Sequence, residues 1–256
     1  MPFTISHAAA AIPLRRTKLV LSALVIGCMA PDFEYFLHAG MYGRESHNLR
    51  GALDFALPAT LILLVAFHVL LKRPIVALLP RAIQERVVLQ EFKFWPISRL
   101  LLIVASALIG IATHLLWDSF THTNGWVVRH FAWFREQGVV VFQHPWPNYK
   151  VAQHGSTVLG LVLLAVWLLH WYRTEPRHST PVFSLSTSAK FISVCGIVGI
   201  ATGAGYFRAY ALAGPPGLYG SFVANAIVAF VSATTLELLL FSIALRIRMR
   251  PVRLNG

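Results

Sequence analysis

Apolar segments long enough to cross a membrane recur along this chain, and they constrain its fold more than any other feature. Four of them meet the need of a spanning helix for about 20 mostly apolar residues: roughly residues 99–120, 156–172, 190–212 and 221–245. A fifth, residues 51–71, contains Asp54 and Pro58 but is otherwise apolar. The sequence therefore predicts an all-α protein, a polytopic helical membrane protein.

A sixth candidate, residues 19–37, is weaker because its apolar run stops at Ala30, before Pro31, Asp32 and Glu34. It could cross the membrane obliquely, or it could be a shorter helix buried among the others. The count is thus five to six transmembrane helices. We expect a single helical membrane domain over residues 1–256, with a motif-bearing part at 1–175 and two further membrane helices and a basic tail at 176–256.

Charge is scarce, and its distribution indicates lipid as the partner. Charged residues make up 12% of the chain, against about 25% in a typical soluble domain. The net charge of +12 gathers in short segments between apolar runs, which favours membrane lipids over nucleic acid. With the Arg-rich tail placed in the cytoplasm, six spans put residues 38–50, 121–153 and 214–220 outside. Cys28 and Cys195 lie in apolar stretches and form no disulfide or CxxC pattern.

Two glycines in the fourth apolar segment suggest a packing contact. Gly199 and Gly203 form a small-xxx-small pair, which permits helices to approach closely. We expect this pair to pack against a neighbouring helix, although the same glycines could also face lipid.

Histidines and acids gather where the outer ends of the predicted helices meet. His114 and Asp118 are four residues apart near the end of a helix, so they lie about 6 Å apart on nearly the same face. A neutral imidazole and a carboxylate in this arrangement can bind one divalent ion, with Thr121 supporting them. The alternative is a His–Asp hydrogen bond that only fixes helix packing.

The other candidates are single residues with simpler alternatives. Asp32 follows Pro31, where the chain should bend, and it could point into a cavity or cap a helix. His7 stands beside alanines, and His47 lies in a polar loop. His122 and His154 flank the long outer loop, and His154 comes just before a predicted spanning helix that Ser156 or Thr157 could cap.

Four motifs occur in the order "MPFTISHAAAAIPL", "SALVIGCMAPDFEYFL", "IGIATHLLWDSFTH" and "YKVAQHGSTVLGL". Together they resemble the domain-of-unknown-function 4184 family of bacterial membrane proteins, over roughly residues 1–175. The resemblance implies a multi-pass protein of the bacterial cytoplasmic (inner) membrane. It carries no established activity.

A looser resemblance concerns the order of the polar residues, from an early His and a "PD" to a later His and HxxxD. This order is similar to that of the zinc-dependent phospholipase C and nuclease superfamily and of the membrane-bound metal-dependent hydrolases related to it. The resemblance implies a divalent metal, most consistent with zinc, and the implied ligands are His7, Asp32, His47, His114 and Asp118. The chain lacks the mature N-terminal Trp ligand and a clear HxxxE motif, which favours one or two metals over a three-metal cluster.

Two functional hypotheses follow. The first is a membrane-embedded metal-dependent hydrolase acting on a phosphoester or lipid-linked substrate at the extracytoplasmic surface, with His122 or His154 as the catalytic proton donor. The second is a non-catalytic membrane protein, either a transporter or a scaffold stabilised by a metal. Glu237, deep in the last span, is the main feature that favours transport. No GxSxG motif, P-loop or dinucleotide fingerprint is present in the sequence.

One conflict concerns the side of the membrane. Six full spans would place His7 in the cytoplasm, away from Asp32 and His47. Either the first apolar segment does not cross the membrane, or His7 is not a ligand.

Overall fold

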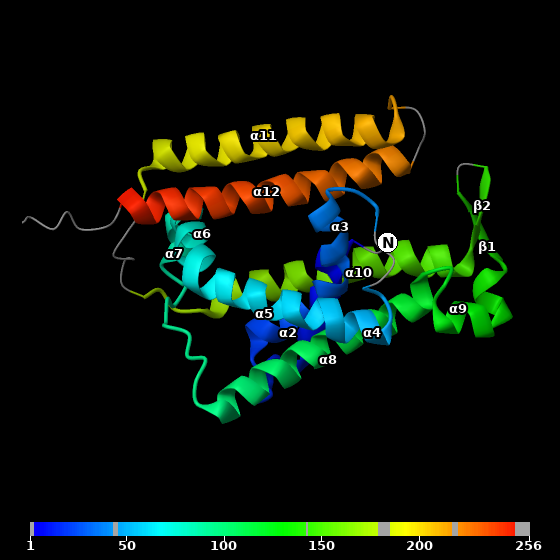
Figure 1. Cartoon of the computed structure of the whole chain (residues 1–256), viewed down its shortest axis with the longest axis horizontal. Helices are drawn as coiled ribbons and strands as arrows, with labels where there is room; N and C mark the ends of the chain where they lie inside the picture. Colours follow the sequence, from blue (N-terminus) through cyan, green and yellow to red (C-terminus); the bar gives the residue numbers. More distant parts are fainter. Residues whose placement is uncertain (1–2, 43–45, 142, 179–184, 217–219, 249–256) are drawn as a thin grey trace, which may run out of the picture. The chain divides into compact units, whose positions relative to one another are not determined.

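The computed structural model describes residues 3–42, 46–141, 143–178, 185–216 and 220–248. Over these residues, helices dominate the fold, and the prediction of a helical membrane protein is confirmed (Figure 1). In the described part of the chain, five helical stretches are long and apolar enough to cross a membrane: Leu49–Leu78, Ile97–His130, Asn148–Thr174, Thr187–Ala213 and Ser221–Ile247.

Most of these stretches contain one long helix, and the first contains several joined pieces. The first consists of α4 (Leu49–Gly51), η4 (Ala52–Ala56), α5 (Leu57–Ala66), η5 (Phe67–Leu71) and α6 (Lys72–Leu78), in which η4 and η5 are π-helical. A short helix α7 (Arg81–Gln84) follows. The second stretch joins α8 (Ile97–Thr121) to α9 (Trp126–His130), and the others are α10 (Asn148–Thr174), α11 (Thr187–Ala213) and α12 (Ser221–Arg248). Between α9 and α10 lie η6 (Ala132–Arg135) and a hairpin of antiparallel strands, β1 (Gln137–Val141) and β2 (His144–Pro147).

The first apolar segment does not form a spanning helix. It is divided into α2 (Leu21–Gly27), η3 (Ala30–Asp32) and α3 (Phe33–His38), after α1 (Thr4–His7), η1 (Ala8–Ala11) and η2 (Pro13–Arg16). The seven residues of α2 cover only about 10 Å. An oblique crossing is therefore wrong, and the alternative of a shorter, buried helix is correct.

Two compact units make up the chain. The first contains residues Met1–Phe33, Arg44–Leu64 and Lys93–Thr174. In it, α2 runs beside α8 in the same direction. The backbone N–H of Val20 donates to Oγ of Ser106 at 2.9 Å, and Sγ of Cys28 lies 3.3 Å from Oγ1 of Thr113. Two glycines allow this approach, since a Cβ on Gly27 or Gly110 would collide with the facing backbone.

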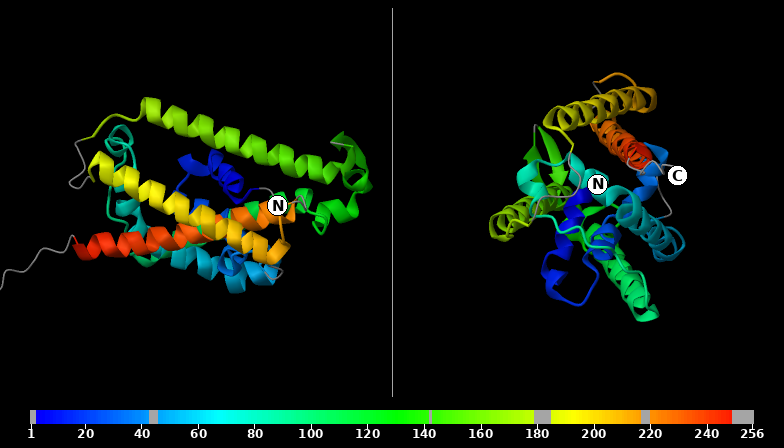
Figure 2. Two further views of the ribbon diagram at one scale, coloured as in Figure 1. Left: turned by 90° about the horizontal axis from the view of Figure 1, so that it is seen from above. Right: turned by 90° about the vertical axis from the view of Figure 1, so that its left-hand side faces the viewer.

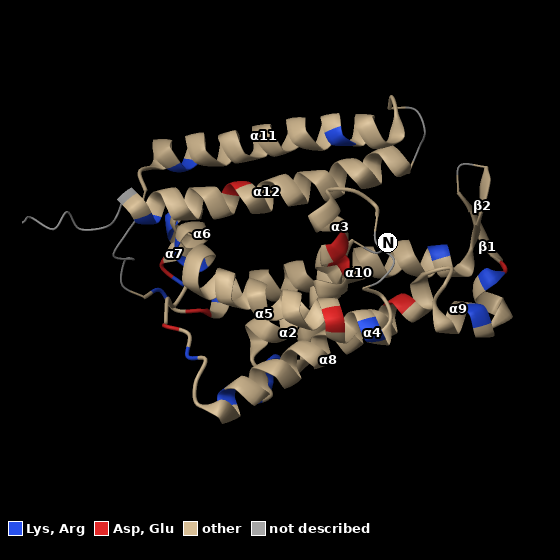
Figure 3. Ribbon diagram, in the orientation of Figure 1, with Lys and Arg blue, Asp and Glu red and all other residues tan. Residues whose placement is uncertain are grey.

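Residues 4–32 therefore form a hairpin beside α8, which we call the N-terminal hairpin. It starts near the C-terminal end of α8, descends to the level of Ser106 and returns through α2. His7 and Asp32, at the two ends of the hairpin, consequently lie at the same end of α8, which removes the conflict over His7. Figure 3 shows the middle of α8 and of α10 without charged residues, as an apolar environment requires.

The second unit contains Glu34–Gly43, Val65–Phe92 and Glu175–Gly256. In it, α11 and α12 lie side by side and antiparallel (Figure 2), with Gly205 against the carbonyl of Ala226. The prediction that Gly199 and Gly203 make a close helix contact is wrong within the described residues, because a Cβ at either position would meet nothing within 4 Å. In the middle of α12, both carboxylate oxygens of Glu237 are buried without a hydrogen-bond partner among the described residues.

Candidate metal centre

The C-terminal turns of α8 carry the pair on which the site is built. Nε2 of His114 lies 3.3 Å from Oδ2 of Asp118, one helical turn further on. Nδ1 of His114 lies 2.7 Å from the carbonyl oxygen of Cys28. A carbonyl oxygen only accepts hydrogen bonds, so Nδ1 donates the proton and Nε2 is the nitrogen that faces Asp118.

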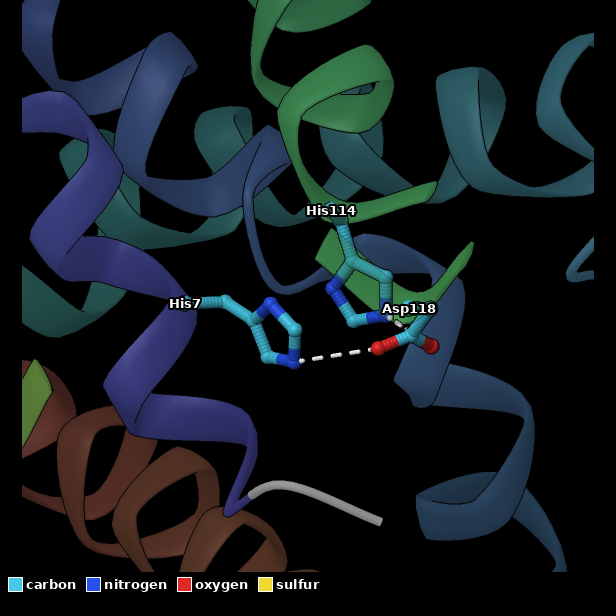
Figure 4. A group of neighbouring side chains, drawn as sticks. All are labelled: His7, His114 and Asp118. Carbon is cyan, nitrogen blue, oxygen red and sulfur yellow. Dashed lines mark ion pairs between the residues drawn. The ribbon is translucent and has the colours of Figure 1, made fainter. Parts of the chain in front are cut away.

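The N-terminal hairpin brings two further candidates to this pair. The ring of His7 stacks on that of His114 with 3.9 Å between centroids, and Nε2 of His7 lies 3.5 Å from Oδ1 of Asp118 (Figure 4). Oδ1 of Asp32 lies 3.6 Å from Nε2 of His114, and Oδ2 of Asp32 accepts a 2.6 Å hydrogen bond from Oγ1 of Thr4. Thr4 thus holds one carboxylate oxygen and leaves the other facing the histidine.

His47 and His122 complete the group. Nε2 of His47 lies 3.2 Å from Oδ1 of Asp32 and 3.5 Å from Oδ2 of Asp118, while Oγ of Ser46 lies 3.0 Å from Nδ1 of His47. Nδ1 of His122 lies 3.4 Å from Oδ1 of Asp118. The structure therefore brings together all five expected ligands and one of the two expected proton donors.

His154 is not brought into this group. The helix α10 begins at Asn148, so His154 lies inside the helix and not before it, and its exposed ring lies 4.7 Å from the ring of Trp146. The hydroxyls of Ser156 and Thr157 do not cap α10, because both lie in its third turn and donate to the carbonyl of Gln153. The hypothesis that His154 donates a proton has no support in this arrangement.

Other residues of the motif "YKVAQHGSTVLGL", which contains His154, have a structural role instead. Thr157 accepts a hydrogen bond from the backbone N–H of Phe3 at 3.2 Å, and Ser156 accepts one from Nε1 of Trp117 at 3.0 Å. Gly160 lies so close to Ser6 that a Cβ would collide with its backbone. The motif therefore fixes α10 to the N-terminal hairpin and to α8.

Burial divides the group into a closed side and an open side. The side chains of His114, His7 and Asp32 are 0%, 1% and 2% exposed. Those of His47 and His122 are 21% and 27% exposed. A molecule arriving from outside would therefore meet His47 and His122 first.

The protonation states of the hairpin residues suit cation binding. Burial lowers the pKa of His7 to about 3, so its ring is neutral at neutral pH. Burial by itself raises the pKa of Asp32. The hydrogen bonds from His47 and Thr4 and the proximity of His114 have a larger, opposite effect, so the pKa of Asp32 lies below its ordinary value. A neutral imidazole and an ionised carboxylate are the forms that bind divalent metals.

The distances within the group fit a metal ion. Two ligands of a tetrahedral zinc ion are separated by about 3.4 Å, given metal–ligand distances of about 2.1 Å. The histidine–carboxylate distances range from 3.2 to 3.6 Å. Among the described residues, two trios have ligand atoms within 4.8 Å of one another: His7, His114 and Asp118, and Asp32, His47 and His114.

Several buried polar atoms in the group also lack a hydrogen bond. Both ring nitrogens of His7, Nε2 of His114 and Oδ1 of Asp118 have no hydrogen-bond partner among the described residues. Leaving such atoms buried and unpaired costs about 1–3 kcal/mol each. A cation between them would satisfy the lone pairs, so the residues present fit a divalent metal.

Asp118 has a special position because its two oxygens face different neighbours. Oδ2 faces His114 and His47, whereas Oδ1 faces His7 and His122. The group therefore offers one position on each side of this carboxylate, which is compatible with one or two ions.

The comparison with protein families gives one match. A family described as a domain of unknown function, DUF4184, matches residues 1–243. No curated protein and no solved structure matches the chain.

Proposed function

The chain belongs to the DUF4184 family, and we propose that it is a membrane-embedded metal-dependent hydrolase of phosphoesters. The observation that carries the proposal is the convergence of His7, His47, His114, Asp32 and Asp118 in one buried group with ligand-like spacing. A purely structural His–Asp pair would need no more than one hydrogen bond. Here three histidines direct Nε2 toward two carboxylates.

The ligands would form two metal positions that share Asp118. Asp32, His47, His114 and one oxygen of Asp118 would hold the first ion, and His7 with the other oxygen of Asp118 would contribute to a second. Nitrogen and oxygen donors at these distances favour zinc among the divalent metals. When bound, such an ion supplies an activated water and positive charge for a phosphoryl oxygen.

The chain's own residues perform the remaining tasks. His122 is on the open side, with Nδ1 3.4 Å from Oδ1 of Asp118, so it is placed to give a proton to a leaving group. Thr4, Ser46 and the carbonyl of Cys28 orient Asp32, His47 and His114. A fixed orientation lowers the cost of assembling the site before each turnover.

A lipid-linked or headgroup phosphoester suits the position of the group. It lies in the C-terminal turns of α8, which is part of a candidate spanning stretch, and in this proposal that end of the helix lies at the membrane surface. The positive-inside rule favours a cytoplasmic location for the Arg-rich tail. Counting five spans back from a cytoplasmic tail would put the C-terminal end of α8 outside, so in this proposal the site faces the extracytoplasmic side of a bacterial cytoplasmic membrane.

The test uses purified protein in lipid nanodiscs, loaded with zinc and offered a chromogenic phosphodiester and a phospholipid. His122→Ala should retain the metal and lose at least tenfold in turnover, because it removes a proton donor and no proposed ligand. His170→Ala, at an exposed position of α10, is the matched control and should leave both properties unchanged. Zinc-loaded protein that hydrolyses neither compound would refute the hydrolase.

One observation favours a different function. The buried, unpaired carboxylate oxygens of Glu237 lie within a candidate spanning helix, where an acid is costly unless it has a role. A transporter with a structural metal would use Glu237 in ion passage. In that case Glu237→Gln would abolish ion flux in proteoliposomes and leave zinc content unchanged.

A further inference from the structure

The segment between α8 and α10 exposes aromatic side chains that the metal centre does not use. Trp126 of α9, Phe131, and Trp133 of η6 are 59%, 54% and 59% exposed. Val127 and Val128, between them in sequence, are buried. The segment 126–133 therefore has one packed side and one open side. We call the open side, formed by Trp126, Phe131 and Trp133, the aromatic face.

This aromatic face stands on a braced backbone. The guanidinium of Arg135 donates to the carbonyls of Val128 and Arg129. The side-chain amide of Asn148 donates to the carbonyl of Trp133 at 2.8 Å, which joins η6 to the start of α10. The exposed rings are consequently held in place and are not on a loose loop.

The aromatic face continues the lipid-facing side of α8. Leu116 and Phe120, near the C-terminal end of α8, are 63% and 40% exposed. The ring of Phe120 lies 6.0 Å from that of Phe134, which in turn lies 5.0 Å from the ring of Trp133. Since α8 is long and apolar enough to cross a bilayer, we take its exposed apolar side to contact lipid, and these edge-to-face ring contacts extend that side to η6.

The charges on the segment match an interfacial position. Arg129 and His130 lie next to the aromatic residues and are exposed, and the ring of His130 stacks on that of Trp126 at 4.4 Å. Aromatic rings combined with basic side chains are typical of the region where acyl chains meet headgroups.

We propose that Trp126, Phe131 and Trp133 form a lipid-contacting surface in the interfacial layer of the bilayer that α8 crosses. The occupant is the membrane lipid and not a second protein. This surface is independent of whether the neighbouring centre binds a metal. It would hold the end of α8, and with it His122, at the level of the headgroups.

The test places a nitroxide label on Trp126→Cys and Trp133→Cys, one at a time, in the Cys195→Ser background and in nanodiscs. Cys28 is buried and is left in place. Collision with oxygen, which concentrates in lipid, is compared with collision with a water-soluble nickel chelate. Leu101→Cys, 64% exposed on α8, provides the lipid reference, and Gln143→Cys, exposed beyond β1, provides the water reference.

Labels at 126 and 133 should collide with oxygen several-fold more often than with the nickel chelate, as we expect for the label at 101. A preference for nickel equal to that at 143 would overturn the proposal. Protection from both reagents would also overturn it, because a second protein would then cover the surface. Where a label perturbs folding, the unlabelled protein is measured in brominated lipid, which quenches tryptophan fluorescence on contact. The double variant Trp126→Phe/Trp133→Phe should then lose part of the fluorescence that the lipid quenches in the wild type.

Discussion

Nδ1 of His114 lies 2.7 Å from the carbonyl oxygen of Cys28, a residue 86 positions earlier in the chain. This one contact joins the end of α2 to α8 and also fixes which nitrogen of His114 faces the carboxylates. The orientation of the central histidine is therefore set by the N-terminal hairpin and not by α8 alone.

Purified protein should contain about one to two equivalents of zinc per chain after dialysis, because the group offers positions on both sides of Asp118. His114→Ala should remove most of this metal, since His114 belongs to both ligand trios. His170→Ala should retain it. Elemental analysis of the three proteins is the measurement, and equal zinc in all three would contradict the site.

Asp118→Asn preserves shape while removing the charge that both halves of the group share. We expect zinc affinity to fall by at least tenfold. The matched control is Asp54→Asn, whose carboxylate is 65% exposed and paired with Arg50 four residues earlier, and it should bind zinc as the wild type does. If Asp118 only made a packing hydrogen bond, its Asn variant would keep the metal and lose about 1 kcal/mol of stability.

Thr4→Val removes the hydroxyl that donates to Asp32 while keeping the side-chain volume. Asp32 then loses the contact that directs Oδ1 to His47 and His114, so zinc affinity should fall by about 10- to 100-fold. Thr4→Ser keeps the hydroxyl and should restore affinity. Competition with a zinc-binding dye provides the measurement, and identical affinities for Val and Ser would assign Thr4 to packing alone.

Gly110→Ala should destabilise the first unit, because the new Cβ would collide with the backbone of α2, and overpacking of this kind costs about 1–3 kcal/mol. Gly199→Ala is the control, since a Cβ there meets nothing within 4 Å. It should leave stability unchanged or increase it by up to about 1 kcal/mol. Thermal melting in detergent compares the two, and a larger loss for Gly199→Ala would contradict the packing described.

The metal-free protein should lose stability as pH falls from 6.5 toward 5. His7 has a pKa of about 3 when folded and an ordinary pKa of 6.5 when unfolded, so in this range only the unfolded chain takes up its proton. Stability should therefore decrease by up to about 1.4 kcal/mol per pH unit. His7→Phe should reduce the slope of stability against pH by the contribution of about one proton. Unfolding in the presence of a chelator at several pH values measures it, and an unchanged slope would place the effect elsewhere.

The sequence was sufficient for those parts of the site that depend on local geometry. His114 and Asp118 were predictable as a pair because four residues on a helix return to the same face. The looser resemblance implied that His7 and Asp32 converge, but local geometry could not predict it, because it requires α2 to be a short helix beside α8. Hydrophobicity alone does not distinguish a short buried helix from a spanning one.

The sequence was insufficient where the position of a residue depends on a helix boundary or on a close contact between two helices. His154 was expected before a spanning helix because the apolar run starts at Ser156, but α10 begins in the polar sequence at Asn148. Gly199 and Gly203 carry a recognisable spacing, yet Gly27 and Gly110 make the close contact from two separate segments. Spacing within one helix gives no information about its partner.

The hydrogen bonds from Phe3 to Thr157 and from Trp117 to Ser156 also have a consequence for biogenesis. Residues 4–32 leave the ribosome before α8 and α10, which form the surfaces that hold them and are synthesised more than 60 residues later. The hairpin must therefore wait beside the translocon without its final partners. Its histidine and aspartate can reach their places only after the third spanning helix has entered the membrane.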